Sequence, residues 1–169
     1  MTASEIPYSG EAIAKVGDIE IAYDAFGNSS GSPLLLVMGL GMQMILWNDA
    51  FCKQLAAQGY WVIRFDNRDV GLSTKFDDAG LPDILSLMQG KAVEVPYRIS
   101  DMASDAVGLL DALKIDAAHV VGVSMGGMIA QSIAIHYPER IRTLTSIMSS
   151  TGNPDLPQPK PEVASILVS

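Results

Sequence analysis

The pentapeptide Gly122-Val123-Ser124-Met125-Gly126 constrains the fold of this chain more than any other segment. A largely apolar run, 117–121, comes directly before it, and a helix-like stretch, 127–137, comes directly after it. A serine between two glycines at a strand-to-helix junction is typical of a nucleophile elbow, a turn so tight that only small residues fit beside the serine. The N-terminus of the helix then points at the Ser124 hydroxyl and favours developing negative charge there. The pattern predicts a nucleophilic serine; the alternative is a plain structural turn.

Strand and helix patterns alternate along the rest of the chain. Six apolar segments have the length and the bounding turn residues of strands: 12–16, 19–26, 34–38, 60–65, 118–123 and 141–148. Helical spacing occupies 48–58 and 100–113, with Ser100 as the expected N-cap, and Pro138 is expected to end the helix that follows the elbow. Gly17-Asp18 is a hairpin signal between the first two strands. The alternation predicts a mostly parallel sheet with helices on both faces.

Four segments together resemble the N-terminal part of an α/β-hydrolase fold enzyme. They are the elbow with its flanks, an Asp-x-Arg-x-x-Gly-x-Ser loop, a His-Tyr-Pro-Glu-Arg helix exit and a glycine loop after the third strand: 119–128, 65–73, 136–140 and 37–41. The chain is similar to serine esterases of this family, and in particular to bacterial esterases of the aclacinomycin methylesterase group. The resemblance implies that residues 1–150 form the N-terminal part of the hydrolase core. Residues 151–169 would then be a connector and the start of a cap, or lid, in which 162–168 could begin a helix.

The resemblance also implies an oxyanion hole. Acyl transfer passes through an oxyanion that preorganised N–H donors must meet. One donor is the backbone N–H of Met125, the residue after the nucleophile, and the other is that of Leu40, which follows Gly39 in the glycine loop. Met38 stands where the family usually has a histidine, a departure that a backbone donor tolerates. The alternative reading of 38–41 is a glycine turn that merely ends a strand.

A serine nucleophile needs a base, and the two histidines of the sequence do not fit that role. In this fold the chain order is serine, acid, histidine, but His119 precedes Ser124 and lies at the far end of its strand. His136 lies twelve residues after Ser124, which is roughly 18 Å along a helix. We interpret them as strand-entry and helix-end residues. Asp155 is a weak candidate for the acid, because its proline-rich surroundings are more typical of a connector.

The triad is therefore expected to be incomplete within these residues. The sequence could be one fragment of a longer enzyme, a truncated form, or a degenerate non-catalytic protein. The first two are favoured because the nucleophile and oxyanion motifs are intact. We expect a second polypeptide, most simply the rest of the same enzyme, to carry the acid and the histidine. It would also complete the sheet beside the strand at 141–148.

Composition narrows the partners and the compartment. The net charge of −8 and the isoelectric point near 4.5 leave no basic stripe for nucleic acid. The N-terminus has no secretory pattern, and the two most apolar stretches are shorter than the ~20 residues of a membrane span. A cytoplasmic protein is expected, without membrane contact. The single cysteine, Cys52, is expected to be a packed apolar residue, and no metal-ligand spacing or cofactor motif is present.

Other polar and apolar groups near the expected site have two interpretations. Asp66, Arg68 and Asp69 are expected to form a structural network rather than to contact substrate. Trp47 and several methionines could either line a substrate pocket or pack in the core: Met38, Met42, Met44, Met125 and Met128. The function implied is cleavage of a small or medium apolar carboxylic ester through an acyl-enzyme at Ser124. The alternatives are a carbon–carbon bond hydrolase or perhydrolase with the same triad, and a non-catalytic ligand-binding protein.

Overall fold

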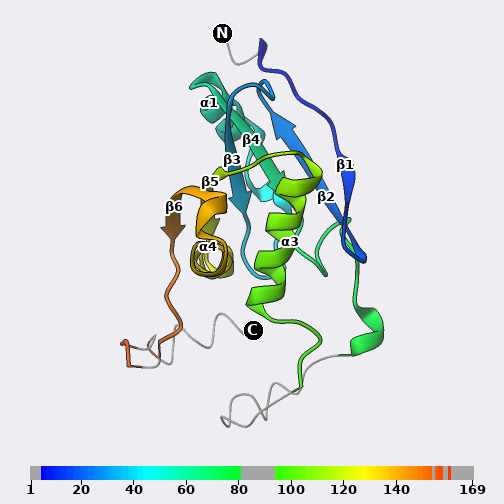
Figure 1. The fold of residues 1–169 in the computed structure, drawn as a ribbon, viewed down its shortest axis with the longest axis vertical. Coiled ribbons are helices and arrows are strands. Elements are labelled where there is room, and N and C mark those ends of the chain that lie inside the picture. Colours follow the sequence, from blue (N-terminus) through cyan, green and yellow to red (C-terminus); the bar gives the residue numbers. More distant parts are fainter. Residues whose placement is uncertain (1–4, 81–93, 154, 158–159, 161–169) are drawn as a thin grey trace.

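The computed structural model describes residues 5–80, 94–153, 155–157 and 160. Its centre is a six-stranded sheet with the strand order β1-β2-β4-β3-β5-β6 (Figure 1). The strands are β1 (Ala12–Val16), β2 (Ile19–Phe26), β3 (Ser32–Val37), β4 (Tyr60–Phe65), β5 (Ala118–Val123) and β6 (Ile141–Ile147). β1 and β2 form an antiparallel hairpin, β2 pairs antiparallel with β4, and the other pairs are parallel. The mostly parallel sheet predicted from the sequence is confirmed.

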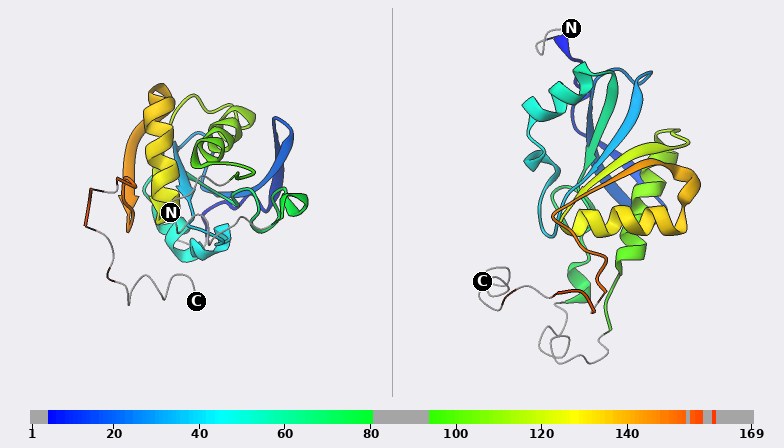
Figure 2. Two further views of the ribbon diagram at one scale, coloured as in Figure 1. Left: turned by 90° about the horizontal axis from the view of Figure 1, so that it is seen from below. Right: turned by 90° about the vertical axis from the view of Figure 1, so that its left-hand side faces the viewer.

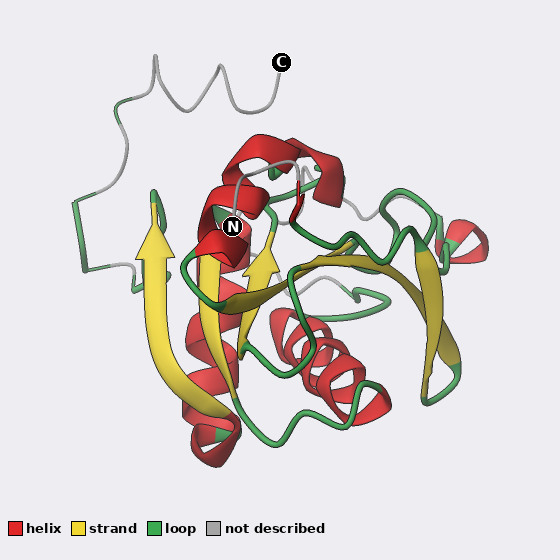
Figure 3. Ribbon diagram, turned by 90° about the horizontal axis from the view of Figure 1, so that it is seen from above, coloured by secondary structure: helices red, strands yellow, loops and turns green. Residues whose placement is uncertain are grey.

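Helices cover both faces of this sheet (Figure 3). α1 (Asp49–Ala57) lies on one face, and α3 (Ile99–Ala112) and α4 (Met125–His136) lie on the other. Short 3₁₀ turns are η2 (Met44–Leu46), η3 (Asp77–Ala79) and η4 (Pro138–Arg140). The predicted N-cap at Ser100 is wrong, because α3 begins one residue earlier and the Asp101 carboxylate accepts the Arg98 N–H at 2.6 Å. The helix expected within 162–168 lies outside the described residues.

β3 shows why its sequence is continuously apolar. Leu34 and Leu36 pack into the cluster beneath α1, whereas Leu35 and Val37 pack into the cluster beneath α3 and α4. Successive side chains of a strand point to opposite faces, so a strand with helices on both sides has no face left for water. This arrangement places β3 at the centre of the molecule. Its carboxyl end, where the glycine loop begins, is therefore held by core packing on both sides.

A buried ion pair ties the antiparallel part of the sheet to α1. The Arg64 guanidinium on β4 donates to the two carboxylate oxygens of Asp24 on β2 at 2.7 and 2.8 Å. Both side chains are almost fully buried, and the Tyr8 hydroxyl donates to the same carboxylate at 2.9 Å. Arg64 also donates to the carbonyl of Trp47, just before α1. A buried charge must be paired in this way to offset its lost hydration, so these contacts fix where α1 begins.

β6 forms one edge of the sheet in the described residues, where it pairs with β5. Most of its side chains are exposed, including those of Leu144 and Ile147, and the next residue, Met148, is 80% exposed. Residues 149–153, which follow β6, leave the sheet (Figure 2). An exposed apolar edge strand can pair with another strand.

No helix within the described ranges has the length and apolar character needed to cross a bilayer.

Candidate active site

Ser124 occupies a strained turn between β5 and α4. Its backbone has φ 56° and ψ −124°, a conformation that non-glycine residues rarely adopt. Two backbone hydrogen bonds of 2.9 Å hold the turn: the Ser124 N–H donates to the Ile147 carbonyl, and the Gly127 N–H donates to the Ser124 carbonyl. The residue itself is exposed, at the carboxyl edge of the parallel strands. Strain of this kind persists only where the surrounding structure enforces it, and it is characteristic of functional sites.

The glycines around Ser124 are required by close backbone approaches. A Cβ atom on Gly122 would lie 2.1 Å from the Gly126 carbonyl oxygen, and one on Gly126 would lie 2.2 Å from the Val37 carbonyl oxygen. On Gly127 it would lie 2.6 Å from the Cβ of Ser149. Because the obstacles at Gly122 and Gly126 are main-chain carbonyl oxygens, they cannot shift without moving the backbone of the sheet or the helix. The spacing of the motif thus reflects the packing of α4 against the ends of β5 and β3.

This packing predicts a stability cost. Gly126→Ala is expected to lower the free energy of unfolding by about 3 kcal/mol, at the upper end of the cost of an inserted methyl group, because main chain is the obstacle. Gly10→Ala is the matched control, since a Cβ there meets nothing within 4 Å and only the positive φ of 75° is penalised. That control is expected to lose about 1 kcal/mol. Denaturant unfolding of the full-length protein measures both, and equal losses would contradict the packing argument.

The glycine loop after β3 reaches the serine. A Cβ on Gly39 would lie 3.2 Å from the Ser124 Cβ and 3.6 Å from its Oγ, so the main chain of the loop lies next to the Ser124 side chain. The Met42 N–H donates to the Gly39 carbonyl at 3.3 Å, and Gly41 has φ 65°. These are the features of a type II turn, which requires a positive φ at its third residue. Leu40 is the second residue of this turn, directly after Gly39.

The two proposed oxyanion donors are both free in the part of the chain that the structure describes. The Leu40 N–H donates no hydrogen bond there. Met125 is the first residue of α4, and the N–H of a first helical residue has no acceptor within its own helix. Their sequence positions were expected to meet at Ser124, and the contact between Gly39 and Ser124 brings the Leu40 turn there. That the two N–H groups converge on one oxygen stays a prediction.

The two histidines are engaged elsewhere. The Nδ1 of His119 lies 2.7 Å from the Thr143 hydroxyl on β6, and the ring packs edge-on against Tyr60. The Nδ1 of His136 lies 2.9 Å from the Ser132 carbonyl, within the last turn of α4. These contacts confirm the strand-entry and helix-end interpretations. Asp155 is exposed, its N–H donates to the Asn153 side chain at 2.9 Å, and no described contact joins it to Ser124 or a histidine.

The Asp-x-Arg-x-x-Gly-x-Ser loop is confirmed as a structural network. The Asp66 carboxylate accepts the N–H groups of Met44 at 2.7 Å and Leu72 at 3.0 Å. Gly71, with φ 52°, lies against that carboxylate so closely that its Cβ would be 1.8 Å from an Asp66 oxygen. The Ser73 hydroxyl donates to the Asp66 carbonyl at 2.6 Å. Each of these motif residues therefore holds the loop that follows β4.

The arginine of the same motif ties the loop to α3. Arg68 forms a bidentate ion pair of 2.6 Å with Asp105, and its guanidinium lies over the rings of Phe76 and Tyr97, which contact each other. Burial and a hydrogen bond to Asp69 raise the pKa of Tyr97 to about 12, so this phenol is neutral at physiological pH. A hollow of about 500 Å³ is lined by Asp69, Phe76 and Tyr97 among others, and Ser124 is not part of it.

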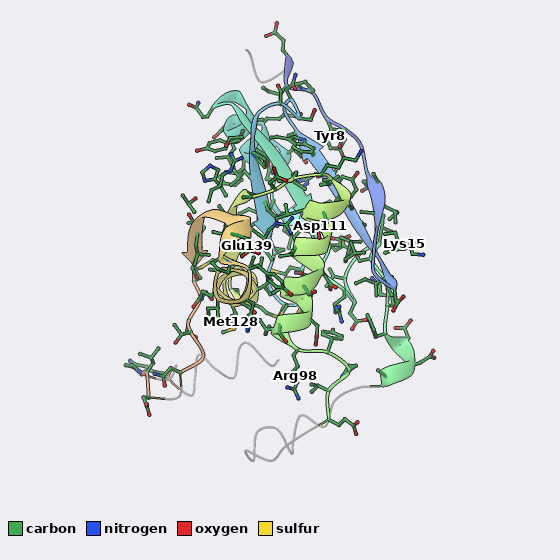
Figure 4. The ribbon with its side chains drawn as sticks, viewed as in Figure 1. Tyr8, Lys15, Arg98, Asp111, Met128 and Glu139 are labelled. Carbon is green, nitrogen blue, oxygen red and sulfur yellow. The ribbon has the colours of Figure 1, made fainter. Side chains whose placement is uncertain are left out.

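Trp47 and the methionines near Ser124 differ in burial. Met38, Met44 and Trp47 are buried, whereas Met42 is exposed and Met125 is half-buried. Met128 is half-buried on α4 (Figure 4). Cys52 is fully buried, and burial raises the pKa of its thiol to about 11, so it is not a competing nucleophile. Within the described residues no group of three His, Cys, Asp or Glu side chains could hold a metal ion.

Comparisons with known proteins agree with this geometry. A family model described as alpha/beta hydrolase fold matches residues 32–166. The rhodomycin D methylesterase DauP of Streptomyces sp. (strain C5) is 37% identical over 131 residues, which are 78% of this chain and 39% of that protein. The 3-oxoadipate enol-lactonase 2 of Acinetobacter baylyi is 34% identical over 73% of this chain and 39% of its own length. The chain thus spans about two fifths of these relatives.

A solved structure supports the same assignment. A hydrolase from Pseudomonas aeruginosa PA01 matches with a TM-score of 0.69 and 26% identity. The match covers 95% of this chain and 54% of the other.

Proposed function

Because the chain belongs to the alpha/beta hydrolase fold family, we propose that it is the N-terminal part of a serine esterase that cleaves a small or medium apolar carboxylic ester through an acyl-enzyme at Ser124. The observation that carries the proposal is the approach of Gly39 to the strained Ser124, 3.2 Å from a Cβ on Gly39 to the serine Cβ. This contact brings a candidate oxyanion loop to a candidate nucleophile. If Ser124 lay in a purely structural turn, the glycine loop would have no reason to approach it.

The reaction follows from this arrangement. Ser124 Oγ attacks the ester carbonyl carbon while a histidine takes its proton. The oxyanion that forms accepts hydrogen bonds from the N–H groups of Met125 and Leu40, at the positive end of α4. The bond between the carbonyl carbon and the alcohol oxygen breaks, the histidine returns the proton to the leaving alkoxide, and the acyl group remains on Ser124. Water, activated by the same histidine, then releases the acid.

The histidine and its acid partner are proposed to come from outside these 169 residues. His119 and His136 are held by Thr143 and Ser132, away from the serine hydroxyl. In this family the triad residues follow the chain order serine, acid, histidine, so the missing acid and histidine are expected after Ser124. A polypeptide that brings them to Ser124 would also cover the open edge at β6.

The apolar substrate is supported by exposed side chains at the edge of the sheet where Ser124 lies. The strands β3, β4, β5 and β6 are parallel, so the loops after them meet at one edge of the sheet. Large apolar side chains are exposed in the loops after β3, β4 and β6: Leu40, Met42, Leu72 and Met148. Ligands of open α/β sheets bind at this edge. A methyl ester is the simplest candidate, since the similar DauP protein is named a methylesterase.

Activity of the full-length protein tests the proposal. We expect hydrolysis of p-nitrophenyl acetate and butyrate and of an apolar methyl ester, with covalent labelling of Ser124 by a fluorophosphonate. Labelling of another residue would remove Ser124 from the role of nucleophile. Peracid formation or carbon–carbon cleavage without ester hydrolysis would favour the related chemistries that use the same triad.

The open edge leads to a second prediction. Residues 1–169 purified alone are expected to be inactive on esters and poorly soluble, because β6 exposes apolar side chains and an unpaired edge. Adding a polypeptide that carries the missing part should restore both solubility and hydrolysis. Size-exclusion chromatography and an ester assay measure the two effects. A monodisperse monomer of only these residues that hydrolyses esters would contradict the argument for a missing base.

A further inference from the structure

The segment that carries Leu40 is fastened by side chains from β4 and the loop after it. The amide of Asn67 donates to the Met38 carbonyl at 3.1 Å, before the turn. The Asp66 carboxylate accepts the Met44 N–H at 2.7 Å, after the turn, and the Arg64 guanidinium donates to the carbonyl of Trp47. Between the first two anchors, the described turn has a single hydrogen bond of its own, from Met42 N–H to the Gly39 carbonyl. Its position therefore depends on the anchors at its two ends.

Asn67 holds the residue directly before Gly39, whose main chain approaches Ser124. Its side chain is buried, with 2% of the residue exposed, and the Met38 carbonyl decides which end of the amide faces the loop, because only the nitrogen can donate. The Met38 oxygen would also lie 2.7 Å from a Cβ on Gly126. One carbonyl is thus held between the Asn67 amide and the first turn of α4. No other described side chain donates to it.

Fixing this carbonyl fixes the start of the turn. The Met38–Gly39 peptide is trans, so its carbonyl and its N–H point in opposite directions within one plane. A rotation of that plane would swing Gly39, and with it the Leu40 N–H, relative to Ser124. Oxyanion donors act over a narrow range of about 2.7–3.1 Å. A displacement of about 1 Å is sufficient to lose most of their effect.

We infer that Asn67 is a positioning residue for the oxyanion hole, acting through the Met38 carbonyl, with Asp66 holding the far end of the same turn. The inference rests on the proposed function at Ser124. It assigns to Asn67, the x position of the Asp-x-Arg motif, a task that differs from that of Arg68. Arg68 ties the loop to α3, whereas Asn67 reaches across to Met38, the residue that follows β3, and Asp66 reaches to Met44.

The test uses Asn67→Asp in the full-length protein. This nearly isosteric change replaces the donor with a carboxylate that repels the Met38 carbonyl. The kcat for p-nitrophenyl butyrate is expected to fall about 10- to 100-fold, less than the 10²–10³-fold loss of a deleted donor, because the donor is displaced rather than removed. The Ki of butylboronic acid, which forms a tetrahedral adduct with the serine, should rise by a similar factor. The Ki of butyramide, which forms no such adduct, should stay within about twofold.

A matched variant separates positioning from stability. Asp105→Asn breaks the ion pair between the same loop and α3 without touching Met38. It is expected to lower Tm while kcat and the boronic acid Ki stay within about twofold of the wild type. If Asn67→Asp behaves like Asp105→Asn, with Tm lowered but kcat and the boronic acid Ki retained, the positioning role is overturned.

A structural readout keeps the two proposals distinguishable. If the wild-type protein hydrolyses no ester and binds no boronic acid, the proposed function fails on its own. The crystal structure of Asn67→Asp then decides the anchoring: displacement of the Gly39–Leu40 peptide from Ser124 supports it, and an unchanged peptide overturns it.

Discussion

Replacing Ser124 with alanine is expected to lower kcat of the full-length protein on p-nitrophenyl butyrate by about 10⁴–10⁶-fold. The change removes the hydroxyl that would form the acyl-enzyme. Residual hydrolysis would come from the donors and the binding surface that remain. The fold should persist, because the turn is held by main-chain hydrogen bonds of Ser124, whose partners are Ile147 and Gly127. Steady-state kinetics and circular dichroism measure the two properties.

Ser104→Ala is the control for this experiment. Ser104 is exposed on α3, so its loss should leave kcat and fluorophosphonate labelling unchanged. Ser124→Ala should abolish the labelling. An alanine variant that stayed folded and kept its esterase activity would show that Ser124 is not the nucleophile. A variant that lost its fold would instead mean that the hydroxyl is needed by the turn.

Replacing Leu40 with proline is expected to lower kcat by about 10²–10³-fold, the loss that follows removal of one oxyanion donor. Proline has no N–H, and its φ of about −65° suits the second position of a type II turn, so the turn itself should be retained. The turn is indicated by the Met42 N–H bond to the Gly39 carbonyl and by φ 65° at Gly41. The change therefore deletes the proposed donor and little else in the main chain. Kinetics on p-nitrophenyl butyrate measures the loss.

Leu40→Ala provides the matched control, because it shortens the side chain and keeps the N–H. Its kcat should stay within a few-fold of the wild type, with any change falling on KM if the exposed leucine contacts the apolar part of the substrate. Equal kcat losses in the proline and alanine variants would assign the effect to the side chain. Unchanged kcat in the proline variant would remove Leu40 from the oxyanion hole.

Local patterns were sufficient for most of the elements. The predicted strands at 12–16, 19–26, 60–65 and 118–123 have the boundaries seen in the structure. Apolar periodicity and turn residues depend only on residues close together in the chain, so they can be recognised without knowledge of the tertiary structure. The sequence predicted the wrong N-cap for α3, because Ser100 has the favoured residue type but Arg98 occupies the N-cap position. Asp101 reaches back to the Arg98 N–H, so the helix starts before Ser100.

The sequence by itself determined the elbow at Ser124 through a local pattern, glycine at fixed spacing on both sides of the serine. The requirement at Gly122 is local, since a Cβ there would meet the Gly126 carbonyl oxygen of the same turn, whereas the obstacle at Gly126 is the Val37 carbonyl oxygen of β3. The sequence also determined that the two histidines lie too far along their elements to serve Ser124. Rise per residue is a constant of strands and helices, so such distances follow from numbering alone.

Only the tertiary structure decided which residues from different strands and loops contact one another. The strand order places β3 between β4 and β5, which brings Gly39 to Ser124 and Asn67 to the Met38 carbonyl. The burial of Asp24 with Arg64 likewise depends on the pairing of β2 with β4. Each of these contacts joins residues that are remote in the chain. Their physical basis is the packing of a sheet between two helical layers, in which a polar group is satisfied by whichever partner the strand order places beside it.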